Sequence, residues 1–169
     1  MVSASVSTDI STMPKFGFSA NFSAGDVHKQ MQEFALRVHK ATVTTLQYIG
    51  EQCVAEAREN GSYQDRTGNL RNSVGYVIVY NGSIISGNFA ERVNGKVASE
   101  VSGMEEGQKV AELLASNISK GYALIVVAGM HYAQYVESLN YDVLDSAERL
   151  AERIVPSLLQ QLKSKVAKL

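Results

Sequence analysis

Apolar residues recur with the period of an α-helix over residues 26–60. They form two slightly offset stripes, Val27, Met31, Phe34, Val38 and Ala41, then Val43, Leu46, Ile49, Cys53 and Ala57. Gly25 or Asp26 offers an N-cap, and Asn60 with Gly61 offers a stop. Because a helix of this length spans about 50 Å, we expect it either to bend at the β-branched run 42–45 or to contact another chain with one end.

A second helical pattern runs from about residue 143 to the end of the chain. Its apolar stripe consists of Ala147, Ala151, Ile154, Leu158, Leu162 and Val166. Lysines in the last turns complement the helix dipole. Pro156 lies in mid-helix and removes a backbone hydrogen bond, so the pattern predicts a kink there that costs about 3 kcal/mol.

Between the helices the pattern changes to that of strands. Apolar and small residues alternate over residues 74–80, and Asn81-Gly82 is a strong hairpin turn signal that leads into a return strand ending near Phe89. Residues 122–128, YALIVVA, are continuously apolar, which predicts a central strand buried on both faces. The order of elements predicts an α+β fold, in which a small, mainly antiparallel sheet packs against a long N-terminal helix and a C-terminal helix.

Residues 91–120 interrupt this pattern as an insertion. Asn94-Gly95 predicts a tight turn, and Ser102 to Glu105 has the spacing of a capping box. The helix that follows is expected to place Val110, Leu113, Leu114 and Ile118 on one side. Gly107 is expected to weaken its first turn.

Residues 1–24 form a separate N-terminal segment, before a single domain over residues 25–169. Six of them are serine, and only Asp9 and Lys15 carry charge. Phe16, Phe18 and Phe22 alternate with small residues. Two interpretations stay open: a disordered terminus, or an arm that docks through these phenylalanines, for instance on a neighbouring subunit.

Composition narrows the functional classes. The net charge of −1 provides no global field for nucleic acid. Cys53 is the one cysteine, so no internal disulfide forms, and a reducing compartment is expected. No apolar run reaches the ~20 residues that span a bilayer, and residues 1–10 lack the basic and apolar regions of a signal peptide.

The sequence shows little catalytic chemistry. It contains no HExxH, CxxC, GxSxG or P-loop motif. His39 is expected to be a half-buried structural histidine and Cys53 an inert core thiol. Asp142 and Asp145 suit a helix start better than acid–base catalysis. We therefore expect no catalytic group, no metal and no cofactor, and no enzymatic activity.

Two arginines flank the turn at residues 67–69. Arg66 and Arg71 are placed where they can touch phosphate, but an ion pair with Asp65 on the loop surface is the favoured interpretation.

Two short elements carry the most information. The first has Thr67, Gly68, Leu70 and Ser73 in a TGxLxxS pattern, and the second has Tyr132, Ala133, Tyr135, Val136 and Glu137 in a YAxYVE pattern. Gly68 can supply a positive φ at a turn, and helical spacing places Tyr132 and Tyr135 on one face. These residues either form only the seam between the last strand and the last helix or also shape a subunit contact.

The order and spacing of the two elements over residues 26–165 resemble those of the tail-completion (neck) proteins of long-tailed bacteriophages. The resemblance implies a structural virion protein, made in the bacterial cytoplasm, that forms a homo-oligomeric ring, expected to be a hexamer. The ring would join the head connector or stopper to the tail terminator or tail tube, and DNA would pass through without sequence-specific binding. Membrane partners are not expected.

Two alternatives stay open. One is another neck ring, such as a tail terminator or stopper. The other is a small bacterial ligand-binding domain or enzyme with an unrecognised site. In the ring interpretation, Thr67, Gly68, Leu70, Ser73, Tyr132, Tyr135 and Glu137 mark the fold and a candidate subunit contact, and Phe16, Phe18 and Phe22 mark an arm contact.

Overall fold

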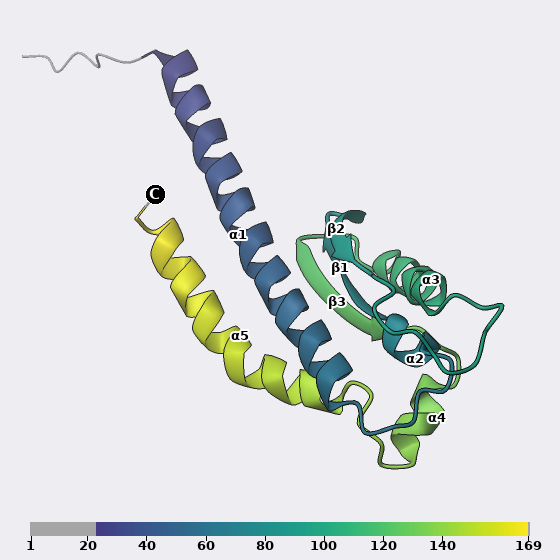
Figure 1. Ribbon diagram of the computed structural model, residues 1–169. Coiled ribbons are helices and arrows are strands. Elements are labelled where there is room, and N and C mark those ends of the chain that lie inside the picture. The colour runs from purple at the N-terminus through teal and green to yellow at the C-terminus, as the bar shows by residue number, and fades with distance from the viewer. Residues whose placement is uncertain (1–22, 169) are drawn as a thin grey trace, which may run out of the picture.

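The computed structural model describes residues 23–168 as five helices and a three-stranded sheet. In chain order these are α1 (Ala24–Asn60), α2 (Asn69–Asn72), β1 (Val74–Tyr80), β2 (Ser83–Asn88), α3 (Gly103–Ala115), β3 (Tyr122–Ala128), α4 (Ala133–Ser138) and α5 (Asp145–Val166). The expected α+β architecture is confirmed (Figure 1). The expected arm residues Phe16, Phe18 and Phe22 lie outside the described residues.

Helix α1 is continuous for 37 residues and runs as a straight rod (Figure 1). Its N-cap is Ser23, not Gly25 or Asp26, and Asp26 completes a capping box with it. Of the two expected alternatives, the bend at residues 42–45 is not seen: the helix stays continuous there, with the hydroxyls of Thr42 and Thr45 donating to the carbonyls one turn earlier.

The two halves of α1 have different surroundings. Ile49, Cys53 and Ala57 in the second half are buried in the core. In the first half the apolar stripe continues into solvent, where the exposed fraction of Met31 is 66% and that of Phe34 is 40%. The first half therefore projects beyond the sheet (Figure 1).

The sheet is antiparallel, with strand order β2-β1-β3. The hairpin prediction is confirmed, since Asn81 and Gly82 both have positive φ, at 48° and 85°. The prediction that the apolar run 122–128 is the central strand is wrong. Strand β1 is central, and β3 is an edge strand that is apolar because helices pack near both of its faces.

Helices cover the two faces of the sheet. Helix α3 packs on one face, through Ala111 and Ala115 against Val77, Val79 and Val127. On the other face, α1 contributes Ile49 and Cys53 and α5 contributes Ala147, against Tyr76 and Ile78.

The buried side of α3 agrees only in part with the expected one, since Val110 and Ile118 pack against the core as predicted. Leu113 and Leu114 are exposed, and the stripe against the domain consists of Gly103, Gly107, Ala111 and Ala115. Small residues at four-residue spacing let the α3 backbone lie directly on the chain beneath it. The expected cap is present, because the Ser102 hydroxyl accepts from the Glu105 N–H.

Helix α5 runs back alongside α1 and curves along its length (Figure 1). It continues through Pro156 as one helix from Asp145 to Val166. The proline therefore lies within the helix and does not end it.

Candidate functional site

The two signature elements, far apart in sequence, meet in one apolar cluster. Leu70 of the first element is buried together with Met130, Ala133 and Val143, and Tyr132 and Val136 of the second element pack against them. Ser73 joins the elements through polar contacts. Its hydroxyl donates to the Leu70 carbonyl at 2.8 Å and accepts from the Met130 N–H at 3.3 Å. We call this group of residues the signature cluster.

Gly68 performs two functions at the turn that opens the first element. Its φ of +79° confirms the expected left-handed conformation. A Cβ there would lie 2.6 Å from the carbonyl oxygen of Val93. A Cβ on Gly95 would lie 2.1 Å from the carbonyl carbon of Thr67, so the two loop backbones lie directly against each other.

The first part of the insertion is held by two buried asparagines. Asn72 accepts the N–H groups of Arg92 and Val93 with its side-chain oxygen and donates to the Val93 carbonyl. Asn69 donates to the Ser99 hydroxyl at 2.8 Å. Residues 90–102 contain no strand, so none flanks the tight turn expected at Asn94-Gly95, and these amide contacts take the place of a strand ladder.

Arg58 is a structural residue whose role no sequence pattern indicates beyond its position on α1. Its guanidinium donates to the carbonyls of Arg71 at 3.1 Å, Val74 at 2.6 Å and Ala90 at 3.1 Å. It therefore connects the end of α1 to the start of β1 and to the chain after β2.

The second element divides into packed and exposed residues. Tyr132 packs in the signature cluster, and burial raises the pKa of its phenol, with Asp65 adding to the effect. Glu137 accepts the Leu144 N–H at 3.0 Å and so fixes the approach to α5. Tyr135 is 66% exposed, so the prediction that it shares a face with Tyr132 is wrong.

The predicted ion pair of Asp65 with the flanking arginines is also wrong. Asp65 accepts the backbone N–H of Arg71 at 2.8 Å. The Arg71 guanidinium donates to the Gly61 carbonyl at 2.7 Å and lies 5.1 Å from the ring centre of Tyr63. Arg66 is exposed. Within residues 23–168 the ion pairs are Lys109–Glu106 and Arg149–Asp142.

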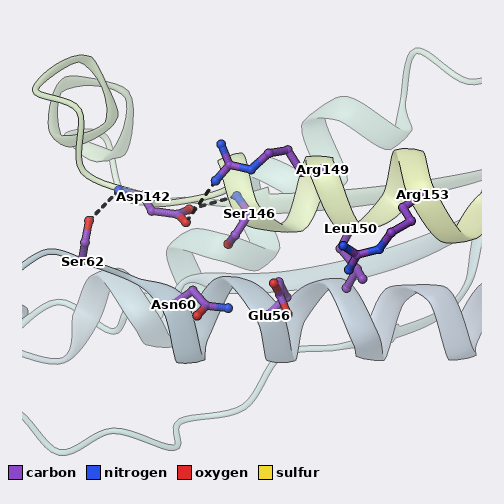
Figure 2. Close-up of a pocket in the computed structure, with 8 residues that line it drawn as sticks. All are labelled: Glu56, Asn60, Ser62, Asp142, Ser146, Arg149, Leu150 and Arg153. Atoms are coloured by element: carbon purple, nitrogen blue, oxygen red, sulfur yellow. Dashed lines mark hydrogen bonds and ion pairs between the residues drawn. The ribbon is translucent and has the colours of Figure 1, made fainter.

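A polar cleft of about 440 Å³ lies where the end of α1 meets the start of α5. Glu56 and Asn60 of α1 lie opposite Ser146 of α5 across it, and the side chain of Arg149 extends toward Asp142 (Figure 2). Asp142 organises this cleft, because its carboxylate accepts the Ser146 N–H at 3.0 Å and lies 3.6 Å from Arg149.

The polar residues of the cleft hold the start of helix α5. The Asp142 N–H donates to the Ser62 hydroxyl at 2.8 Å, and its carboxylate takes the place of a cap on α5, as expected for this aspartate. Neither histidine nor cysteine lines the cleft among the described residues. The contacts of the cleft join the Asp142 carboxylate to the Ser146 N–H and place it near Arg149, while the Ser62 hydroxyl accepts the Asp142 N–H.

The remaining titratable residues behave as structural groups. His39 is half-buried as expected, with Nδ1 at 2.6 Å from the Tyr122 hydroxyl. Burial raises the pKa of the Cys53 thiol, which fits an inert core cysteine. In residues 23–168 no group of three His, Cys, Asp or Glu side chains is placed to bind a metal ion. No helix in that part of the chain is both long and apolar enough to cross a bilayer.

A second hollow, which is apolar, is a groove of about 550 Å³ between α1, α5 and β3. Leu46 of α1, Leu124 and Val126 of β3, and Val155 and Leu159 of α5 contribute to its lining. None of its described lining residues is charged. We call it the apolar groove.

Comparison with known proteins found no matching family model, no matching curated protein and no matching solved structure. Function must therefore be inferred from the geometry of the chain itself. The structure brings Leu70, Ser73 and Tyr132 together, positions Thr67, Gly68 and Glu137 around them, and leaves Tyr135 in solvent.

We expect Gly68→Ala to lower the free energy of unfolding by about 2–3 kcal/mol, since both its φ and the Val93 carbonyl oppose a side chain. Gly121 is a matched control, because its φ of +75° is similar but a Cβ there would have nothing within 4 Å. Gly121→Ala should lose only about 1 kcal/mol. Urea unfolding followed by circular dichroism measures both, and equal losses would show that the loop contact has no energetic effect.

Proposed function

We propose that this chain is a structural protein of a phage neck, which forms a ring that joins the head connector to the tail tube. The observation that supports this most is the convergence of the TGxLxxS and YAxYVE elements in one cluster of an α+β domain flanked by two long helices. The signature residues are turn-formers and packing residues, so their role is architectural. They fit a protein whose work is docking.

The exposed surfaces also support a docking role. The first half of α1 carries exposed Val27, Met31 and Phe34 on a projecting rod. At the other end of the molecule, Tyr135, Leu139 and Tyr141 are exposed on and after α4 (Figure 1). Two apolar surfaces at opposite ends suit the heterologous contacts that close a ring by rotation.

The charge balance is compatible with DNA passing through such a ring. The net charge is −1, and binding of duplex DNA rises with the number of phosphates that lysine and arginine neutralise. A near-neutral lumen would release the passing duplex, whereas a strongly basic one would retain it.

The proposal predicts ring particles. Purified protein, studied by light scattering and negative-stain imaging, should form rings alone or on mixing with the head-connector protein of the phage that encodes it. The gene should lie between the portal or capsid genes and the tail-tube gene. A stable monomer that ignores the connector and binds a metabolite would overturn the proposal and favour a ligand-binding domain.

Tyr135 allows the contact to be tested without disturbing the fold. Because its side chain is 66% exposed, Tyr135→Ser should leave the unfolding midpoint within error and reduce ring formation. Leu113→Ser on α3, where the side chain is 68% exposed, is the matched control and should assemble normally. Normal assembly of the Tyr135 variant would show that Tyr135 makes no subunit contact and that the YAxYVE element acts only in packing of the fold.

A further inference from the structure

The apolar groove leaves the face of β3 partly uncovered. Leu124 and Val126 point to the α1 and α5 side of the sheet and are only half-buried. On the opposite face, Ala123, Ile125 and Val127 pack with α3. Within residues 23–168, β3 pairs only with β1, so its other edge carries unpaired backbone groups beside the groove.

The sequence of residues 15–22 matches this place. Phe16, Phe18, Ala20 and Phe22 occupy alternate positions, and Lys15, Gly17, Ser19 and Asn21 occupy the others. Since successive side chains of a strand point to opposite faces, the phenylalanines would share one face. A strand of this pattern added to the β3 edge would place all three aromatic rings on the side of the uncharged groove.

The length of chain decides which copy can supply this segment. Thr42 is the first α1 residue that lines the groove, and it lies 18 residues after Ala24, about 27 Å along the helix. Phe18 precedes Ala24 by six residues, which span at most about 21 Å when fully extended. Phe22 reaches still less far, and Phe16, eight residues before Ala24, spans at most about 29 Å and so reaches only the near end of the groove. The three phenylalanines therefore cannot occupy the groove of their own chain together.

We propose that residues 15–22 of one copy bind in the apolar groove of a second copy, as an added strand on the edge of β3. The exchange buries the phenylalanines on a surface without charge and pairs the open strand edge. Repeated from copy to copy, it is a heterologous contact that can close into a ring. The inference goes beyond the proposed function, because arm exchange between copies does not depend on the particle to which they belong.

Crosslinking of two differently tagged full-length copies tests the exchange. One carries Ala20→Cys, which keeps all three phenylalanines, and the other carries Leu159→Cys on the groove wall, where the side chain is 40% exposed. A short bismaleimide should give a heterodimer that contains both tags. The native Cys53 is buried but lines the same groove, so a mixture of Ala20→Cys with unsubstituted protein measures how much product it contributes.

Three controls test whether the crosslink is specific for the groove, depends on the phenylalanines and forms between chains. Leu113→Cys on α3, on the opposite side of the sheet, should give at least tenfold less heterodimer than Leu159→Cys. Adding Phe16→Ser and Phe18→Ser to the Ala20→Cys chain should abolish the product, whereas adding Val6→Ser and Ile10→Ser should not. A chain that carries both Ala20→Cys and Leu159→Cys should crosslink between chains at all concentrations that allow assembly.

The inference is overturned if no heterodimer forms, if the product depends on Val6 and Ile10 and not on the phenylalanines, or if the doubly substituted chain closes on itself as a monomer. Its outcome is separable from that of the proposed function. Arm exchange with no response to any head connector would reject the neck assignment alone, and connector-bound rings without the Ala20–Leu159 crosslink would reject the exchange alone.

Discussion

Gly107→Val is expected to lower the free energy of unfolding by about 4 kcal/mol, which is a large part of the stability of an ordinary domain. A Cβ at this position would lie 2.4 Å from the backbone carbonyl oxygen of Ser73. Gly129, whose N–H donates to the same Ser73 carbonyl at 3.2 Å, also lies against the Gly107 backbone, and its own Cβ would lie 2.4 Å from the Gly107 Cα. Backbone cannot move aside as a flexible side chain can, so α3 must shift away from the sheet.

Gly25→Val is the matched control, because it is also a helical glycine. Its Cβ would meet only the Ser23 hydroxyl oxygen, at 3.5 Å. Its unfolding midpoint should change little, since glycine and valine differ by well under about 1 kcal/mol in helix propensity. The chain has no tryptophan, so urea unfolding is best followed by far-UV circular dichroism. A Gly107 variant as stable as the Gly25 variant would show that α3 adjusts freely.

Helices, hairpin and fold class can be predicted because their signals are local. Asn81-Gly82 specifies a turn in which both residues have positive φ, and the structure has that turn. The apolar spacing over residues 26–60 likewise indicates α1 to within two residues at its start. Such signals depend on the conformation of neighbouring residues and need no knowledge of the rest of the molecule.

The order of the strands is not predictable in the same way. The run 122–128 predicts a central strand, but β1 takes that position because it pairs with both neighbours. A continuously apolar strand indicates that both of its faces are covered by other residues. It does not indicate whether one or both of its hydrogen-bonding edges are paired with another strand. The small-residue stripe of α3 is not predictable either, because it depends on contacts with residues distant in sequence. From the sequence Gly107 is expected only to weaken the helix, whereas the structure places it against the Ser73 carbonyl.

The candidate site can be predicted only in part. The motif spacing identifies Leu70, Ser73 and Tyr132, and the structure joins them in one cluster. Tyr135 departs from the prediction, because helical spacing of three residues leaves about 60° between two side chains and the cluster boundary falls between them. The buried asparagines Asn69 and Asn72 give no sequence signal because their partners lie in a loop of irregular structure.

Arg58→Ala is expected to lower the free energy of unfolding by about 3–4 kcal/mol, since it removes three charge-assisted hydrogen bonds and leaves carbonyl groups without their partner. The Val74 residue that provides one of them is fully buried, so water cannot easily replace the guanidinium there. Burial lowers the pKa of Arg58, and the charge of Arg92 adds to the effect. The lowered pKa agrees with a guanidinium that is partly buried. Urea unfolding followed by circular dichroism measures the loss.

Two further variants separate the hydrogen bonds from the charge and from helix propensity. Arg58→Lys keeps the positive charge but cannot span three carbonyls with a planar fork, so it should recover less than half of the loss. Arg37→Ala, on the exposed half of α1, should leave the unfolding midpoint nearly unchanged. If lysine restored full stability, the charge alone would account for the role of Arg58. The expected failure of lysine instead assigns that role to the geometry by which one guanidinium holds the end of α1, the start of β1 and the chain after β2 together.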